Sequence, residues 1–248
     1  MRFFLLNFVL SVPFWLLAAT TGLQLRPGLP VSSLAFVCPG MAAAILVYKE
    51  SKGAGVSELL KRALDFSRTR AKAWYVPVAL LMPVVTVLTY GLMRLMGMPI
   101  LGPQFSPLAA LAMFLAFCLT ALGEELGWSG YVIDPLQERW NAQKASILVG
   151  IVWAIWHFVP LMQGHRSTTW IAWWSLYTVA LRVLIVWLYN NTGRSVLAAT
   201  LFHAFSNISS VTYSSYYDAR ITGLIVAFLA AIVILVWGPR ALVRMKDA

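Results

Sequence analysis

Long apolar stretches separated by short polar segments run along most of the 248-residue chain. Runs of about 17–25 apolar residues match the length at which an α-helix crosses a bilayer. The pattern predicts eight such helices, at about residues 3–20, 31–48, 74–96, 106–128, 145–162, 168–189, 195–213 and 220–238. We therefore expect an all-α, polytopic membrane protein, a bundle of about eight transmembrane helices. Residues 1–248 are interpreted as a single integral membrane domain.

Two segments between these runs have more than one interpretation. The stretch 50–73 is hydrophilic, but apolar residues alternate with its basic ones, so it fits either an interfacial helix or a solvated loop. The stretch Trp128–Trp140 fits a continuation of the preceding helix, a turn or an interfacial helix.

The composition supports a membrane protein and changes how the positive net charge is interpreted. The chain is 60% hydrophobic and 11% charged, whereas soluble domains average about 45–50% and about 25%. A net charge of +10 would suggest nucleic acid in a soluble protein. Here the cations lie in loops, so we expect the lipid bilayer and no nucleic acid as partner. Cys38 and Cys118 each lie inside an apolar run and are expected to be small core residues, not a disulfide.

The lysines and arginines also predict how the chain is oriented. They concentrate in the loops on one side of the predicted spans, and the cytoplasmic side of a membrane protein carries the excess of Lys and Arg. The N-terminal stretch is interpreted as an uncleaved first helix. We expect a multi-pass protein of a bacterial inner (plasma) membrane with both termini in the cytoplasm.

Two adjacent acids, Glu124 and Glu125, end an apolar run that has no charge from Leu108 onward. A charge inside a bilayer costs at least about 2.5–3.5 kcal/mol, and two neighbouring like charges disfavour each other further. Consecutive helical residues point about 100° apart, so one carboxylate can face a reacting centre while the other faces a neighbouring helix. The pair is interpreted as the centre of a functional site.

Other polar residues inside the predicted spans complete a candidate set. His157 lies in the fifth span, Arg182 in the sixth, and His203 and Asn207 in the seventh. His203 and Asn207 are four residues apart and project from one helix face. A lone intramembrane His is more often a helix-packing residue than a catalyst, His203-x-x-x-Asn207 alone could hold helices together, and Arg182 alone could snorkel to the membrane surface. Together with the acids they favour a hydrolytic site.

The residue types suit activation of water. A carboxylate in a dry site can act as general base, and an imidazole can help to hold the water. A second imidazole and an amide can donate to an oxyanion. Neither Ser206 nor Cys118 is placed beside a base, so direct attack by water is favoured over a covalent intermediate.

These residues resemble a known family. Glu124-Glu125 followed by Trp128 and Gly130, an aromatic-x-x-x-His ending at His157, and His203-x-x-x-Asn207 are similar to the motifs of the CPBP family. It comprises CAAX prenyl endopeptidases and bacteriocin-processing membrane proteins and is also called ABI. The match covers about residues 106–215.

The resemblance implies an intramembrane glutamic-type endopeptidase with an eight-helix bundle. Glu124 would activate water with the assistance of His157, His203 and Asn207 would form the oxyanion hole, and Glu125 would be a supporting acid. The substrate would be a membrane-associated peptide or protein. CAAX-type members cleave after a prenylated cysteine near a protein C-terminus.

The chain departs from the family at one position. The first motif commonly reads Glu-Glu-x-x-x-Arg, and Ser129 stands where the arginine is expected. We hypothesise that Arg182 replaces this charge and pairs with Glu125 from the sixth span.

Two other functions remain open. Two histidines and a glutamate could bind zinc in a metal-dependent hydrolase, although no His-Glu-x-x-His is present, so no cofactor is the favoured expectation. An inactive relative could serve as a membrane scaffold or immunity protein. The sequence leaves the substrate and the oligomeric state open.

Overall fold

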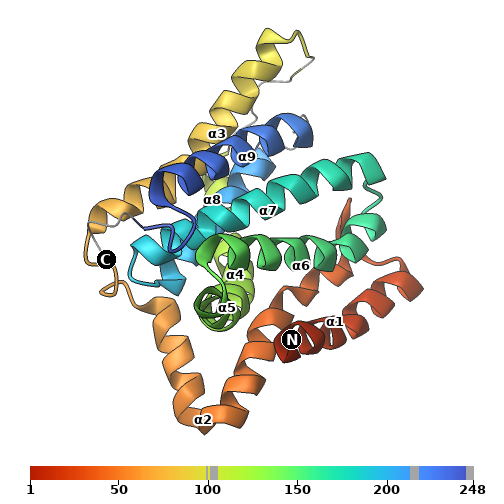
Figure 1. Cartoon of the computed structure of the whole chain (residues 1–248). Coiled ribbons are helices and arrows are strands. Elements are labelled where there is room, and N and C mark those ends of the chain that lie inside the picture. Colours follow the sequence, from red (N-terminus) through yellow and green to blue (C-terminus); the bar gives the residue numbers. More distant parts are fainter. Residues whose placement is uncertain (99, 101–105, 213–217, 244–248) are drawn as a thin grey trace.

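The computed structural model describes residues 1–98, 100, 106–212 and 218–243. Helices make up nearly all of this part of the chain. Within it, seven helical segments are long and apolar enough to cross a membrane. The prediction of an all-α, polytopic membrane protein is confirmed (Figure 1).

The α-helices agree with most of the predicted spans. They are α1 (Arg2–Thr21), α2 (Cys38–Leu64), α3 (Tyr75–Leu95), α4 (Pro107–Gly127), α5 (Ile133–Arg139), α6 (Ala142–Gln163), α7 (Thr168–Asn191), α8 (Val196–Thr212) and α9 (Ala219–Trp237). Shorter elements are the 3₁₀ helices η1 (Val31–Val37) and η2 (Lys72–Trp74), the π-helix η3 (Trp128–Val132), and a hairpin of β1 (Gln24–Arg26) and β2 (Leu29–Pro30).

The structure differs from the predicted spans in two places. The predicted span 195–213 corresponds to α8, which has 17 residues and is not among the seven long apolar segments, and residue 213 lies outside the described part. The hairpin that follows α1 was not predicted, because its strands are only two and three residues long.

Helix α2 continues far beyond the apolar run that predicted it. At Lys52 the backbone takes φ 55° and ψ −152°, which interrupts the helix, and α2 appears as a V in Figure 1. The second arm covers much of the hydrophilic stretch, so the helical alternative for residues 50–64 is confirmed. Leu59 and Ala63 on this arm are buried against the rest of the protein.

The core forms around α7, which lies between α6 and α9 (Figure 1). Leu184, Ile185, Val186 and Leu188 on α7 are completely buried. Large apolar side chains remain exposed on the outer helices, as expected where lipid takes the place of water. Examples are Leu5 and Leu16 on α1, Leu80 and Val87 on α3, Leu111 and Leu119 on α4, and Phe228 and Leu235 on α9.

Glycines allow α2 and α4 to approach closely. A Cβ added at Gly127 would lie 2.5 Å from the carbonyl oxygen of Pro39, and one at Gly123 would lie 2.9 Å from that of Phe36. Real Cβ atoms do not come so near to a carbonyl, so only glycine fits. Small residues spaced four apart commonly permit such contact between membrane helices. This contact fixes the last turn of α4, which carries Glu124 and Glu125.

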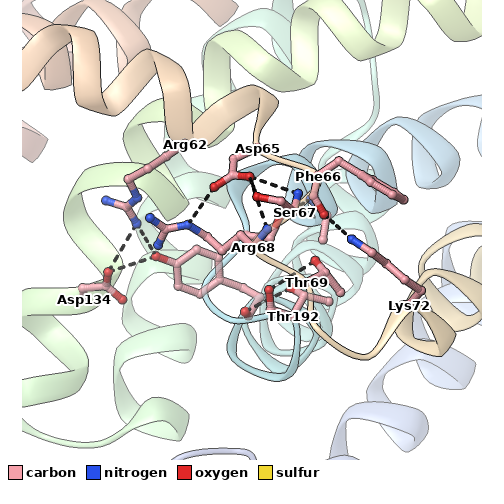
Figure 2. A network of polar contacts seen from close by, with 12 residues as sticks. Arg62, Asp65, Phe66, Ser67, Arg68, Thr69, Lys72, Asp134 and Thr192 are labelled. Carbon is pink, nitrogen blue, oxygen red and sulfur yellow. Dashed lines mark hydrogen bonds and ion pairs between the residues drawn. The ribbon is translucent and has the colours of Figure 1, made fainter.

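A polar network ties the second arm of α2 to η3, α5 and α7. Arg62 donates to the carbonyl oxygen of Gly130 at 3.1 Å and to the hydroxyl of Tyr189 at 2.8 Å. The Tyr189 hydroxyl donates to Asp134 at 2.9 Å. Figure 2 shows Arg62 and Asp134 facing each other, 3.6 Å apart. Because Gly130 belongs to η3, this network supports the turn directly after the two acids.

The loop after α2 is held against the end of α7. Thr69 donates to the carbonyl oxygen of Thr192 at 3.2 Å, as Figure 2 shows. Within the loop, the Ser67 hydroxyl donates to Asp65 and holds the pKa of that carboxyl below its usual value. Hydrogen bonds therefore join the second arm of α2 and the loop after it to η3 and to the C-terminal end of α7.

Candidate active site

Glu125 and Arg182 form an ion pair inside the helix bundle. The Arg182 Nη1 donates to Glu125 Oε2 at 2.8 Å, and Nη2 donates to Oε1 at 3.0 Å. Both side chains are completely buried. This bidentate geometry is the strongest that arginine makes with a carboxylate. The hypothesis that Arg182 replaces the motif arginine as the charge partner is confirmed.

Two further groups complete the environment of Glu125. The Ser129 hydroxyl, one helical turn later, donates to Oε2, and the His203 Nδ1 lies 3.0 Å from Oε1. Each carboxylate oxygen thus has two partners. Glu125 is not among the residues that line the nearby cavity. Its carboxylate is therefore paired within the protein and does not line the cavity.

Glu124 has a different environment. Its Oε2 accepts a hydrogen bond from the indole Nε1 of Trp153 at 2.6 Å, and its side chain lines a cavity. The Arg182 guanidinium carbon lies 4.2 Å from the centre of the Trp153 ring. Trp153 therefore contacts both Arg182, through its ring, and Glu124, through its N–H group, which holds one oxygen of Glu124 in place.

The cavity has a volume of about 240 Å³. Of the five predicted catalytic residues, it brings together Glu124, His157, His203 and Asn207, and Glu125 lies behind it. The full lining is Arg26, Glu124, Trp153, His157, Arg166, Trp170, Trp174, Tyr177, Thr178, Leu181, His203, Asn207 and Ser210.

Both imidazoles pack edge-on against Trp153. Ring centres are 5.7 Å apart for Trp153 and His157 and 5.1 Å apart for Trp153 and His203. The His157 Nδ1 lies 2.9 Å from the carbonyl oxygen of Trp153. A carbonyl only accepts, so Nδ1 carries the proton and the Nε2 of neutral His157 keeps a lone pair. Such a nitrogen can accept a hydrogen bond from water.

The position of the proton on His203 follows from the same argument. Its Nδ1 faces the Glu125 carboxylate, which accepts, so Nδ1 carries a proton. The Nε2 edge is left for the cavity that His203 lines. Asn207, one turn later on α8, lines the same cavity and is partly exposed in it.

The roles of several residues in and around the cavity were not predicted from the sequence. The Trp153 indole was interpreted only as an aromatic wall, yet it is a hydrogen-bond donor to Glu124. Ser129 was regarded as a missing charge, although its position four residues after Glu125 indicates helical contact. Nothing in the local pattern pointed to Arg26 or Arg166, because both reach the cavity from connections between helices.

No group of three or more His, Cys, Asp or Glu side chains in the described ranges is arranged to hold a metal ion. Cys38 and Cys118 are free, in agreement with the prediction that they do not form a disulfide.

Comparisons with known proteins agree with this site. Residues 106–209 match the family described as type II CAAX prenyl endopeptidase Rce1-like. The chain is also 28% identical to CAAX prenyl protease 2 of Methanococcus maripaludis, over an alignment that covers 95% of this chain and 92% of that protein. The matched family segment contains Glu124, Glu125, His157, His203 and Asn207. These similarities and the helical membrane architecture support the resemblance of the chain to the CPBP family of intramembrane proteases.

Proposed function

We propose that this protein is an intramembrane endopeptidase that hydrolyses a peptide bond with water activated by Glu124. The observation that carries the proposal is the division of the two acids. Glu125 is neutralised by Arg182, whereas Glu124 lines the cavity with a carboxylate that has one indole partner. An acid in this second setting is available as a general base.

The proposed reaction needs only groups of the chain, water and the peptide. Glu124 takes a proton from a water molecule as the water oxygen attacks the carbonyl carbon. The carbonyl oxygen becomes an oxyanion in the tetrahedral intermediate. The carbon–nitrogen bond then breaks, and protonated Glu124 returns the proton to the leaving nitrogen. The products are a carboxylic acid and an amine.

The remaining cavity residues have separate roles in this scheme. The lone pair of His157 Nε2 accepts from the attacking water, which leaves the second proton of that water directed at Glu124. Asn207 offers an amide N–H₂ to the oxyanion. His203, held by the contact of its Nδ1 with Glu125, contributes its Nε2 edge to the same oxyanion site.

Glu125 is proposed as a positioning residue. It touches His203 and Ser129 but does not line the cavity. The proposed substrate is a membrane-associated peptide or protein, and the proposed location is a bacterial inner membrane with both termini in the cytoplasm.

A comparison of Glu124→Gln with Glu138→Gln tests the proposal. Glu138 is an exposed acid on α5, so its substitution controls for the loss of one charge. Cells that express each variant are compared with wild type by proteomics of membrane-protein termini. We expect new termini with wild type and Glu138→Gln and none with Glu124→Gln. Identical termini in all three samples would contradict an enzymatic role for Glu124.

The same experiment separates the alternatives. An inactive scaffold or immunity protein would keep its biological effect in Glu124→Gln, because the substitution preserves shape. A zinc hydrolase would lose activity in a strong chelator and regain it with added zinc, whereas the Glu124 mechanism predicts chelator resistance.

A further inference from the structure

The second arm of α2 has three chemically different sides. Leu59 and Ala63 are buried against the rest of the protein, whereas Leu60 and Leu64 are each more than half exposed. Consecutive helical residues point about 100° apart, so the two exposed leucines share one side of the arm, next to the buried side. Exposed Lys61 lies on the third side. The arm therefore carries a protein-facing side, an apolar side and a polar side.

The arm and the loop after it connect two segments that are apolar enough to cross a membrane. The first arm of α2 belongs to one of them, and α3 belongs to the next (Figure 1). In the loop, Phe66 is also more than half exposed, and the Lys72 ammonium lies 3.8 Å from the centre of its ring. Figure 2 shows the two residues side by side. Apolar side chains beside lysines are typical of a helix that lies in the membrane interface.

The stretch from residue 49 to residue 72 carries an excess of positive charge, with seven basic and three acidic residues. Two of the acids have hydrogen-bond donors within the protein, because Glu50 accepts from the Tyr131 hydroxyl and Asp65 accepts from Ser67. In the part of the chain that the structure describes, five of the basic residues are exposed and take part in no ion pair: Lys49, Lys52, Lys61, Arg70 and Lys72. Basic clusters next to a membrane span attract anionic lipid headgroups.

The protein-facing side of the arm touches the turn that follows the two acids. A Cβ added at Gly130 in η3 would lie 2.9 Å from a methyl carbon of Leu59. Arg62 donates to the carbonyl oxygen of Gly130 and to the hydroxyl of Tyr189. A ligand that holds the arm at the membrane surface therefore also supports η3.

We propose that the second arm of α2 and the loop after it form a docking surface for anionic phospholipids. Its apolar part enters the boundary between headgroups and acyl chains and consists of Leu60, Leu64 and Phe66. Its basic part pairs with the lipid phosphates and consists of Lys61, Arg70 and Lys72. The docking surface lies outside the cavity, so the proposal goes beyond the proposed function and does not depend on it.

The first test measures how added lipid stabilises the protein. Purified protein in dodecylmaltoside is titrated with phosphatidylglycerol or with phosphatidylcholine, and its melting temperature is followed. A ligand that binds only the folded state raises the melting temperature. Each Lys or Arg near an anionic surface contributes about a fivefold gain in binding. We therefore expect half-maximal stabilisation at a concentration at least about tenfold lower for phosphatidylglycerol than for phosphatidylcholine.

Variants assign this preference to the docking surface. In the test variant its three cations are replaced together, as Lys61→Gln, Arg70→Gln and Lys72→Gln. In the control variant three exposed cations outside it are replaced together, as Arg94→Gln, Arg139→Gln and Lys144→Gln. The test variant should respond equally to both lipids, and the control variant should keep the preference. Equal responses of wild type to both lipids, a preference that survives in the test variant, or a loss in both variants would overturn the proposal.

The second test locates the contact with the membrane. In protein with Cys38 and Cys118 replaced by alanine, Leu64→Cys or Glu58→Cys is labelled with a nitrobenzoxadiazole fluorophore. Glu58 is exposed and lies about 120° around the arm from Leu64. In nanodiscs that contain lipids with a nitroxide on the acyl chain, we expect quenching at Leu64→Cys and little at Glu58→Cys. Equal quenching at both positions would contradict an oriented docking surface.

A soluble polyanion is the other possible ligand of these cations. If inositol hexakisphosphate without added lipid stabilises wild type as well as phosphatidylglycerol does, the surface does not recognise a membrane and the proposal is wrong. None of these measurements involves cleavage, so a failure of the Glu124 mechanism would leave their results unchanged.

Discussion

Glu124 and Glu125 are neighbours in sequence but occupy two different electrostatic environments. Glu125 is enclosed by Arg182, Ser129 and His203, whereas Glu124 lines the cavity with Trp153 as its partner. A rotation of about 100° between consecutive residues of a helix is enough to separate them. One acid is therefore paired inside the helix bundle, while the other lines the cavity.

The ion pair predicts a large loss of stability when one partner is removed. Arg182→Met leaves the Glu125 charge buried without its cation, which typically costs about 3–5 kcal/mol. We expect a loss of this size in the free energy of unfolding, measured by denaturant titration in detergent. Arg194→Met is the control, since Arg194 is half exposed and pairs with Asp134 at 3.8 Å. It should change stability by about 1 kcal/mol or less, and equal losses in both variants would contradict the assignment.

Replacing Trp153 by phenylalanine should reduce the activity with little change in packing. Trp153→Phe keeps an aromatic ring and removes the N–H that donates to Glu124. A hydrogen bond to a charged group contributes about 1.5–3 kcal/mol, so kcat/KM should fall about ten- to a hundredfold. Trp156→Phe is the matched control, because the Trp156 indole donates to Ser11 instead. The measurement is the rate of peptide cleavage by the two purified variants. Equal rates would contradict a role in activity for the hydrogen bond from the Trp153 indole to Glu124.

For single residues, the sequence allowed us to predict which charges pair, but not the geometry of the individual contacts. Arg182 and Glu125 could be paired in advance because an isolated charge in an apolar helix is costly and needs an opposite one. The choice between Trp153 and Trp156 as donor could not be made, since both lie on the same helix and only its packing decides which indole meets Glu124. The contact of His203 with Glu125 was also missed, because it depends on the relative height of α4 and α8.

Among the elements, the contact of α2 with α4 decides where the acids lie. Gly123 and Gly127 let the backbone of α4 touch Phe36 and Pro39. The sequence predicted an apolar helix here but not its close neighbour, because glycine spacing does not identify a partner helix. The extent of α2 beyond Lys52 also exceeded the apolar pattern, since Leu59 and Ala63 are buried by tertiary contact.

Gly127 predicts an effect on both stability and activity. In Gly127→Ala the new methyl group would lie 2.5 Å from the Pro39 carbonyl oxygen, so α2 and α4 must separate. Overpacking of this kind costs about 1–3 kcal/mol. We expect a lower melting temperature and slower peptide cleavage.

The control for this prediction is Gly91→Ala on α3, where no atom lies within 4 Å of the added methyl group. Alanine is the better helix former, so Gly91→Ala should be neutral or more stable by about 0.5–1 kcal/mol. A Gly127→Ala protein as stable and active as Gly91→Ala would show that the close contact is unimportant.

On the scale of the whole molecule, the polar network around Arg62 and the cavity-lining residues Arg26 and Arg166 lie at opposite ends of the bundle. Asn191 on α7 binds the carbonyl oxygen of Leu242, and the loop after α2 binds Thr192, so these segments share one end. Arg26 and Arg166 adjoin the C-terminal ends of α1 and α6 at the other end. The basic loops that predict the cytoplasmic side lie with the network, which predicts that Arg26 and Arg166 face away from the cytoplasm.

Cysteine labelling tests this orientation. In a variant with Cys38 and Cys118 replaced by alanine, single cysteines at Gln24, Lys72 and Ala241 are treated with a membrane-impermeant maleimide. We expect labelling from outside the cell only at Gln24. Labelling of Lys72 from outside would reverse the orientation. Labelling of Ala241 from the side opposite to Lys72 would show that α8 does not cross the membrane.

The π-helical turn η3 determines the direction in which the side chains after it point relative to those before it. A π-helical turn contains one residue more than the α-helix it interrupts. Removing that residue would leave one uninterrupted α-helix, but it would rotate Asp134 by about 100° away from Tyr189. The extra residue thus sets the rotation between the two halves of this helical segment, so that α4 presents Glu124 to the cavity while α5 presents Asp134 to Tyr189 and Arg62.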